Sequence, residues 1–261
     1  MENSRRDFLK IAGLSALSIG AGSAFNAFAA SNRHNVTPKP GYLQGENVLT
    51  AKRWGMVIDS RKFESASDLE PIIEACHSIH NVPNHKEKNH EIKWIWEEEF
   101  QHGFTDIQHE YVNKRVKNLP FLMLCNHCQN PPCVRACPTK ATFQREDGIV
   151  LMDFHRCIGC RFCMAACPYG SRSFNFKDPR PIEHQNPDYP TRMRGVVEKC
   201  NFCAERLAIG KMPACVEASN GAIVFGDLDD PGSGVRELLD SNFTIQRKPS
   251  LGTGPSVFYI L

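Results

Sequence analysis

Cysteines are the residues of this sequence whose type and spacing can do chemistry. Cys157, Cys160, Cys163 and Cys167 form the run C-x2-C-x2-C-x3-C, and Pro168 follows it. This spacing is typical of bacterial 4Fe-4S sites, in which three thiolates bind one cluster and the fourth binds a second cluster. Structural zinc is the alternative, but four-cysteine zinc sites usually use two separated C-x2-C pairs. The run therefore predicts iron-sulfur clusters.

A second motif repeats the first, with two extra residues in its middle gap. Its cysteines, which end at a Cys-Pro pair, are Cys125, Cys128, Cys133 and Cys137. Two such motifs exchange their last cysteines, so each cluster takes three ligands from one motif and one from the other. The ligands predicted for cluster A are Cys125, Cys128, Cys133 and Cys167. Those predicted for cluster B are Cys157, Cys160, Cys163 and Cys137.

A third group of cysteines lacks one local ligand. Cys200 and Cys203 form a C-x2-C pair, Cys215 follows, and Ser219 stands where a fourth cysteine is expected. The one remaining cysteine, Cys76, lies far upstream. If the chain descends from a duplicated ferredoxin with four motifs, the first motif pairs with the fourth and Cys76 completes cluster C. The alternative is a weaker site completed by the Ser219 oxygen or by water.

The sequence around Cys76 predicts a helix. Ser67 and Glu70 have the spacing of a capping box at its start. Mostly apolar residues then recur at helical intervals along one face. The members of this face are Leu69, Ile72, Ile73, Cys76 and His80. An isolated cysteine on such a face is usually a small apolar core residue, so the case for Cys76 as a ligand depends on counting the motifs.

The segment between the second and third motifs predicts a hairpin. Residues 142–144 and 149–152 flank Asp147-Gly148, a typical tight turn. We expect this small β element to lie over clusters A and B. By contrast, residues 84–119 contain no candidate ligand and indicate an insertion that packs over a cluster or meets a partner.

Several basic residues and histidines lie beside the cysteines and could tune the clusters. A nearby positive charge favours the more negative, reduced form of a cluster. The candidates are Lys140, Arg156, Arg161, Lys199, His127 and His155. Ordinary packing or a solvated charge is the alternative for each of them. We find no phosphate-binding loop and no Ser-His-Asp arrangement, so no catalytic residue is predicted.

The first 29 residues predict an export signal. Arg5 and Arg6 form the twin-arginine pair, a mildly apolar stretch follows, and a small-x-small pattern ends at Ala29. Retention of the segment as a membrane anchor is the alternative.

Removing the first 29 residues takes away three basic and two acidic residues, so the net charge falls from +2 to +1. This small charge does not favour nucleic acid as a partner. Export also suggests disulfides, but C-x2-C spacing favours convergence on a metal.

These motifs resemble a family, the four-cluster electron-transfer subunits found beside molybdenum reductases and NrfD-type membrane proteins. The matching stretches are 54–59, 125–139, 157–168 and 199–203. A narrower resemblance is to the DsrO group, the exported ferredoxin-like subunits of DsrMKJOP complexes in sulfur-metabolising prokaryotes. It depends on the first motif, of which only Cys76 remains, and on residues 92–100 and 251–255.

The resemblance implies a periplasmic relay of single electrons in a membrane complex. The implied partners are an NrfD-like integral membrane subunit that handles quinone and a multihaem cytochrome c. The relatives bind four clusters, whereas the cysteines here suffice for three. In the relatives, the cluster that this chain lacks is the one expected nearest the molybdenum subunit, which makes a molybdenum reductase the less favoured alternative. No bond chemistry on a substrate is expected of this chain.

Together these features predict an α+β fold of two duplicated ferredoxin-like lobes with inserted loops. Residues 121–190 would form the lobe that binds clusters A and B. Residues 30–120, which include Cys76, and residues 191–261 would form the lobe that binds cluster C. Residues 257–261 predict a short terminal strand. Three 4Fe-4S clusters are therefore expected from twelve cysteines.

Overall fold

The part of the chain that the computed structural model describes comprises residues 47–181 and 185–261. Short helices alternate with short strands in it, which confirms the α+β class at this level. The described residues belong to one compact unit, and none of their helices is long and apolar enough to cross a membrane. The export signal predicted at 1–29 lies outside the described residues. The duplication into two lobes stays a prediction.

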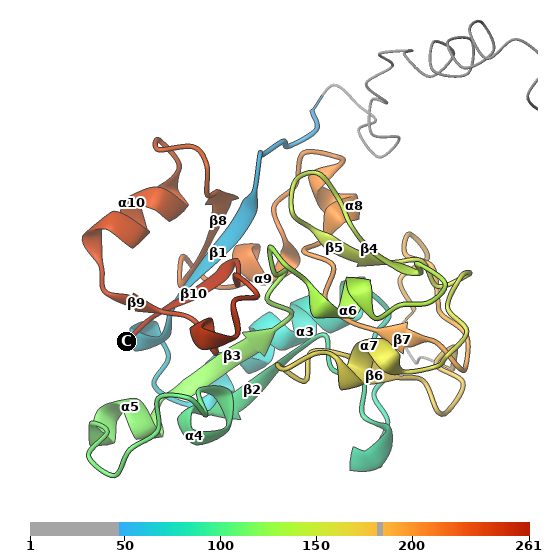
Figure 1. Ribbon diagram of the computed structural model, residues 1–261, viewed down its shortest axis with the longest axis horizontal. Helices are drawn as coiled ribbons and strands as arrows, with labels where there is room; N and C mark the ends of the chain where they lie inside the picture. The colour runs from blue at the N-terminus through green and yellow to red at the C-terminus, as the bar shows by residue number, and fades with distance from the viewer. Residues whose placement is uncertain (1–46, 182–184) are drawn as a thin grey trace, which may run out of the picture. The chain divides into compact units, whose positions relative to one another are not determined.

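The largest sheet joins the two ends of the described chain. β1 (Trp54–Asp59) pairs antiparallel with β8 (Ile223–Asp227) and parallel with β10 (Val257–Ile260). β9 (Thr244–Ile245) pairs antiparallel with β10, so the strand order is β8-β1-β10-β9 (Figure 1). Five of the six residues of β1 are buried, as expected of a strand between two others. The predicted terminal strand is confirmed, and it ends one residue earlier than expected.

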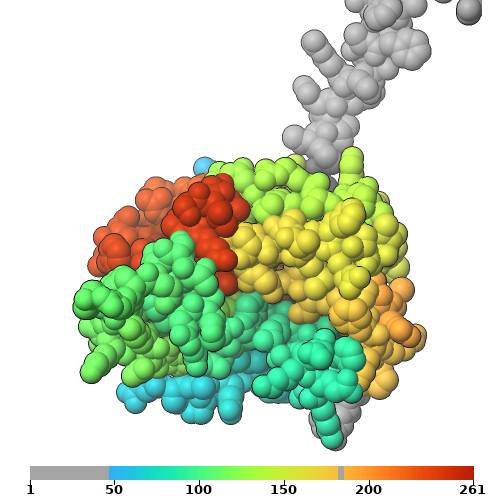
Figure 2. All heavy atoms as spheres, turned by 60° about the horizontal axis from the view of Figure 1, so that its bottom comes forward, coloured from blue at the N-terminus to red at the C-terminus, as the bar shows by residue number. Residues whose placement is uncertain are grey.

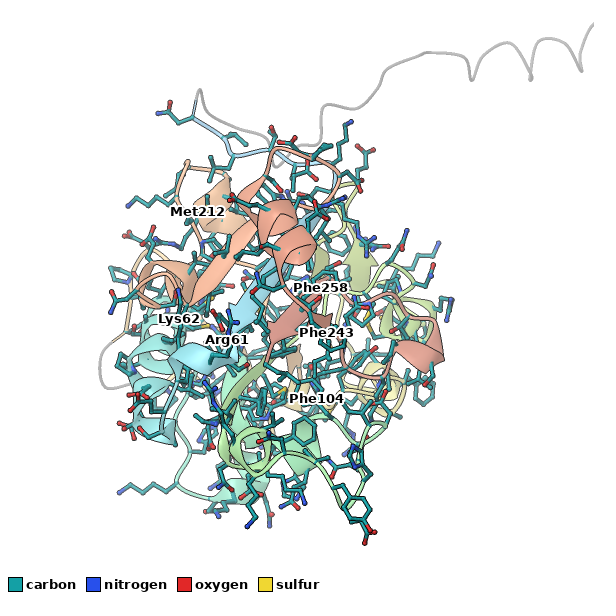
Figure 3. The ribbon with its side chains drawn as sticks, turned by 90° about the vertical axis from the view of Figure 1, so that its left-hand side faces the viewer. Arg61, Lys62, Phe104, Met212, Phe243 and Phe258 are labelled. Carbon is teal, nitrogen blue, oxygen red and sulfur yellow. The ribbon has the colours of Figure 1, made fainter. Side chains whose placement is uncertain are left out.

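The two faces of this sheet pack against different parts of the molecule. On one face, Val57 and Ile260 contact α10 (Gly234–Ser241). The alternate residues Met56 and Tyr259 point into the larger core, as the two-residue period of a strand requires. Figure 3 views the molecule from another side, with Phe258 of β10 labelled.

The helix that carries Cys76 is confirmed, but its predicted cap is wrong. A 3-10 turn, η2 (Ala66–Asp68), precedes α3 (Glu70–Ile79), and the capping box belongs to η2. Its members are Ser65 and Asp68, because the Asp68 carboxylate accepts from the backbone N–H of Ser65 at 3.0 Å. The extra turn moves the cap two residues earlier than helical spacing alone suggests. The predicted buried face is correct except for Ile73, which is only partly buried.

The segment expected to be an insertion contributes to the core. β2 (Ile95–Glu99) pairs antiparallel with β3 (Pro120–Leu124), which leads directly into Cys125. The short helices of this segment are η3 (Lys88–His90), α4 (Phe100–Gly103) and α5 (Lys114–Asn118). Its turquoise-to-green surface spreads over the lower part of the face in Figure 2. Trp94 is buried here and its ring stacks on His80 with centroids 4.6 Å apart, so the segment covers the surroundings of Cys76.

The hairpin between the second and third motifs is confirmed. β4 (Thr142–Gln144) pairs antiparallel with β5 (Val150–Met152), which starts one residue later than predicted. Gly148 has φ +84°, the left-handed conformation that makes Asp-Gly a favoured turn. Asp147 accepts a hydrogen bond from Trp54 Nε1 at 3.1 Å, which ties the turn to β1.

One-turn helices accompany the cysteine motifs. Those of the second and third motifs are α6 (Pro132–Arg135) and α7 (Phe162–Ala165), and those of the last group are α8 (Ala204–Leu207) and α9 (Ala214–Glu217). The remaining short elements are η1 (Ser60–Lys62), β6 (Ser173–Phe174), β7 (Val197–Glu198) and η4 (Pro249–Leu251). The short length of these elements leaves the chain free to turn repeatedly around the sulfur atoms.

A fully buried ion pair links three separate segments. Arg192 lies 2.6 Å from Glu198 Oε2, and both side chains are 0% exposed. Glu198 also accepts hydrogen bonds from Trp94 Nε1 at 2.8 Å and from Asn175 Nδ2 at 2.5 Å. Arg192 donates in addition to the carbonyl oxygen of His80, at the end of α3. The pair therefore anchors the 80–94 region to β7.

We predict that Arg192→Met destabilises the protein strongly. The change leaves Glu198 buried without its counter-charge, which should cost about 3–5 kcal/mol and lower the melting temperature by roughly 10 °C. Anaerobic differential scanning calorimetry measures the change. Arg180→Met is the control, because Arg180 forms an exposed pair with Asp178 and should change little. Equal melting temperatures for the two variants would contradict the prediction.

Candidate iron-sulfur centres

The four cysteines predicted for cluster A line one cavity. The space has a volume of about 310 Å³, and its sulfur-bearing walls are Cys125, Cys128, Cys133 and Cys167. Cys125 follows β3 directly and Cys133 lies in α6, so local elements fix both positions. The other lining residues are Asn126, Pro131, Pro132, Val150, Pro168, Tyr169 and Arg172. The prolines stiffen this wall because their φ angle is fixed.

The four cysteines predicted for cluster B line a second cavity, of about 250 Å³. These residues are Cys137, Cys157, Cys160 and Cys163. The hairpin covers both cavities as expected, because Val150 lines the first and Met152 lines the second. The two residues are on the same strand, so one element positions both walls.

The distribution of the last cysteines follows the exchange predicted from the motifs. Cys167 lies one helical turn beyond Cys163 and lines the cavity of cluster A, away from the rest of its own run. Cys137 lines the cavity of cluster B in the same way. The structure therefore brings together the sulfur sets that the cross-ligation rule assigns.

The cavities and their donors fit 4Fe-4S clusters. Each cavity is lined by four cysteines and, among the described residues, by no histidine or carboxylate. All twelve cysteines lie in the described part of the chain and are free thiols there. Sets of four soft sulfur donors are what a 4Fe-4S cluster requires.

The third group of cysteines is also brought together, from both ends of the chain. Cys76, Cys200, Cys203 and Cys215 are 3–6% exposed. Burial, and then the charges of the other three thiolates, raise the pKa of Cys76 well above its usual value. Three of these residues, Cys76, Cys200 and Cys215, also belong to one buried cluster, so the four thiols lie near one another.

Ser219 does not point its oxygen freely at this group. Its hydroxyl donates to the carbonyl oxygen of Val216 at 2.8 Å and accepts from the backbone N–H of Ile223 at 3.0 Å. The side chain thus joins the end of α9 to the start of β8. This engagement favours Cys76 over Ser219 as the fourth donor.

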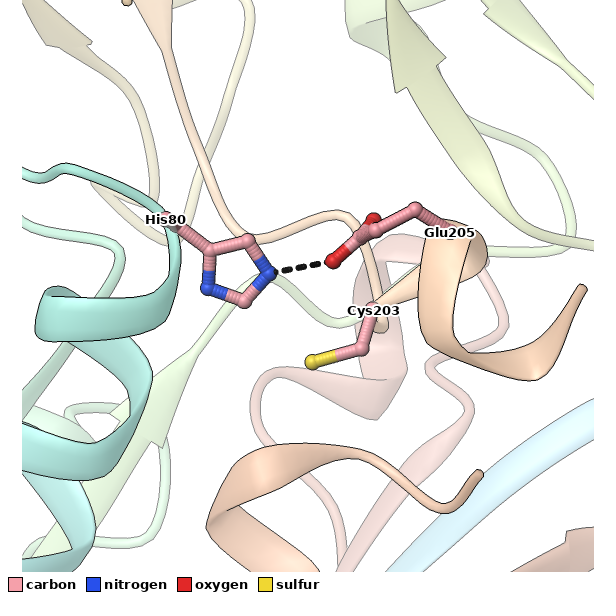
Figure 4. A group of neighbouring side chains, drawn as sticks. All are labelled: His80, Cys203 and Glu205. Carbon is pink, nitrogen blue, oxygen red and sulfur yellow. Dashed lines mark hydrogen bonds and ion pairs between the residues drawn. The ribbon is translucent and has the colours of Figure 1, made fainter. Parts of the chain in front are cut away.

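His80 and Glu205 lie beside the third group, and sequence reasoning did not predict their role. His80 Nε2 is 2.7 Å from Glu205 Oε1, and Nδ1 is 2.7 Å from the carbonyl oxygen of Cys76 (Figure 4). Both ring nitrogens therefore face acceptors. One ligand atom each of His80 and Glu205 and the Sγ atom of Cys203 all lie within 4.8 Å of one another. Glu205 is two residues from Cys203 and His80 is one turn from Cys76, but only the fold shows that the two meet.

Burial and hydrogen bonding act in opposite directions on the pKa values of the cavity cysteines. Burial raises the pKa of Cys128 to about 12, helped by the Cys125 thiolate. For Cys137, burial also raises the pKa, but hydrogen bonds from Thr142 and Thr139 outweigh it and lower the pKa below its usual value. Donors aimed at a sulfur stabilise its negative charge, so they also influence the potential of a bound cluster.

The predicted tuning residues fall into two classes. Lys140, Arg156, Arg161 and His155 are exposed. Lys199 is buried and donates to the carbonyl oxygens of Val150 and Cys200, the latter at 2.6 Å. His127 is buried and stacks on Phe202 with centroids 3.6 Å apart. Of these candidates, Lys199 and His127 are held inside the protein near the cysteines.

Comparison with protein families identifies the central segment. Residues 116–180 match the 4Fe-4S dicluster domain. The segment contains every cysteine that lines the two cavities.

Comparisons with known proteins extend the match to the whole chain. The Hdr-like menaquinol oxidoreductase iron-sulfur subunit 1 of Archaeoglobus fulgidus is 38% identical over 98% of this chain and 97% of its own length. The menaquinone reductase iron-sulfur cluster-binding subunit of Nitratidesulfovibrio vulgaris is 36% identical over 80% of this chain and 88% of its own. A putative dimethyl sulfoxide reductase iron-sulfur subunit of Halobacterium salinarum is 49% identical over 52% of this chain and 53% of its own.

The full-length match, the dicluster domain and the sulfur-lined cavities agree with one another. The chain therefore belongs to the family of iron-sulfur electron-transfer subunits of quinone oxidoreductase and reductase complexes.

Proposed function

We propose that this chain relays single electrons through three 4Fe-4S clusters in a membrane-bound oxidoreductase complex of dissimilatory sulfur metabolism. The observation that carries the proposal is the convergence of twelve cysteines into three groups of four. When bound, a 4Fe-4S cluster takes up and releases one electron. The chain holds the clusters, excludes water from them and sets the charge around them.

Group A shares buried packing with each of the other groups, which supports a relay. Cys125, in group A, belongs to the same buried cluster as Cys200, in group C. Cys133, in group A, packs in the same buried cluster as Cys163, in group B. Electrons could therefore pass between groups B and C through group A, in either direction.

We further propose a periplasmic location, with an NrfD-like integral membrane subunit and a multihaem cytochrome c as partners. The twin-arginine pair and the apolar stretch after it support export. The names of the Archaeoglobus and Nitratidesulfovibrio relatives include menaquinol or menaquinone, which supports a quinone-handling partner. Within this class, the loss of all cysteines of the first motif except Cys76 favours the DsrO group.

A missing fourth cluster would separate this chain from relays that serve a molybdenum enzyme. With the spacing of the ferredoxin run, the three absent cysteines of the first motif would stand at positions 66, 69 and 72. Ala66, Leu69 and Ile72 occupy them, and both Leu69 and Ile72 are buried in the core. Apolar packing thus takes the place of ligands. The similarity to a reductase subunit of Halobacterium salinarum keeps a molybdenum reductase as the second candidate.

The first prediction from this proposal concerns metal content. Protein purified anaerobically should contain about twelve iron atoms and as much acid-labile sulfide per chain, because each 4Fe-4S cluster contributes four of each. Elemental analysis measures both, together with zinc. Stoichiometric zinc with little iron would refute the proposal.

The second prediction concerns the fourth ligand of cluster C. Cys76→Ala should lower the iron content from about twelve to about eight atoms per chain, because one cubane loses a ligand. Ser219→Ala is the matched control and should keep all the iron, since its hydroxyl bonds to backbone groups. Iron analysis and low-temperature EPR of both variants provide the measurement. The reverse result would make Ser219 the ligand.

The third prediction concerns the partner. A pull-down of the tagged chain from solubilised membranes should recover an integral membrane subunit and a c-type cytochrome without molybdenum. Mass spectrometry identifies the proteins, haem staining detects the cytochrome, and elemental analysis detects the metal. Stoichiometric molybdenum in the complex would replace the proposed partner by a molybdenum reductase.

A further inference from the structure

Groups A and B share buried packing. Cys133 of α6 and Cys163 of α7 belong to one buried cluster, together with Val150 and Val197. The two cysteines are assigned to different clusters, so this packing joins the surroundings of clusters A and B.

Arg172 lies beside this shared packing. Its side chain lines the cavity of cluster A, and the residue is 5% exposed. Nη1 donates to Thr142 Oγ1 at 3.1 Å, which fixes the guanidinium against the hairpin. The same atom lies 3.9 Å from Met152 Sδ, and Met152 lines the cavity of cluster B. One planar cation thus lies in the wall of the cluster A cavity and against a residue that lines the cavity of cluster B.

The charge of Arg172 has no carboxylate to balance it. No Asp or Glu among the described residues forms an ion pair with it, whereas the equally buried Arg192 pairs with Glu198. Nη2 also has no oxygen or nitrogen partner within the described ranges. A buried cation without a counter-charge is strongly unfavourable. The negative charge available to balance it is that of the ligand sulfurs.

The cation keeps its charge in this position. The guanidinium of an arginine stays protonated in proteins, so Arg172 keeps its charge when an electron passes.

We propose that Arg172 is a positioning residue that couples clusters A and B, by holding one fixed positive charge beside both and raising both reduction potentials. The inference depends on the proposed presence of the clusters. A fixed positive charge favours the reduced form of each cluster, which is more negative than the oxidised form. When one electron moves, one cluster is oxidised and the other is reduced, and the shared charge serves both without reorientation.

The test is a redox titration of variants, followed by EPR. Arg172→Met removes the charge, and we expect the ratio of reduced to oxidised cluster at a fixed potential to fall about tenfold for both A and B. For one electron, that change corresponds to about 59 mV. The potential of cluster C and the iron content should not change. Unchanged potentials of A and B in a protein with full iron would overturn the proposal.

Two further variants separate this role from a structural one. Arg135→Met removes an exposed charge from α6, two residues from Cys133, and should leave all three potentials unchanged because solvent screens that charge. Arg172→Lys keeps the charge without the planar guanidinium that contacts Thr142 and Met152, so the charge is held less firmly in place. We expect Arg172→Lys to lower the reduction potentials of clusters A and B by less than Arg172→Met does. If Arg172→Met loses iron, lower potentials in Arg172→Lys support the proposal, and unchanged potentials overturn it.

Metal analysis of the wild-type protein distinguishes the two levels of inference. A wild-type chain with far fewer than about twelve iron atoms would refute the proposed function itself. A fully loaded wild type whose potentials do not depend on position 172 would refute only the role of Arg172.

Discussion

The structure depends on bringing twelve sulfur donors into the interior of a small protein. Thiolates repel one another, and burial makes their charge still more costly. The raised pKa values of Cys76 and Cys128 reflect this cost, which binding of iron would remove by replacing the protons. The rest of the fold can be understood as the means of holding these groups in place, with one-turn helices and tight turns where longer elements would not fit.

Buried charges elsewhere follow from the same constraint. Arg172 and Lys199 are both buried, and neither forms an ion pair with a carboxylate in the part of the chain that the structure describes. Arg172 lines the cavity of cluster A, and Lys199 donates to the carbonyl oxygen of Cys200. Arg192, by contrast, has Glu198 as its counter-charge. Arg172 and Lys199 thus leave positive charge beside the cysteine groups.

In the proposed arrangement, ordinary packing replaces the ligands of a fourth cluster. Leu69 and Ile72 fill the core, and the Ser219 side chain bonds to the backbone. Cys76 would be retained because it belongs to a different group, with Cys200, Cys203 and Cys215. A relay with one end shortened in this way would present a different terminal cluster to its partners.

Local spacing in the sequence was enough to determine the two central motifs, the exchange of their last cysteines and the hairpin over them. These features depend on residues a few positions apart, for which the geometry of a turn or a helix leaves few arrangements. The cap of α3 was assigned wrongly from Ser67 and Glu70, because an additional 3-10 turn shifts the start. The tertiary structure alone decided the contacts between distant segments. These are the parallel pairing of β1 with β10, the place of β2 in the core, and the place of Arg172 between the hairpin and the cysteines of cluster A. Each of them depends on folding segments that lie far apart in the chain onto a shared core, and no local pattern encodes that distance.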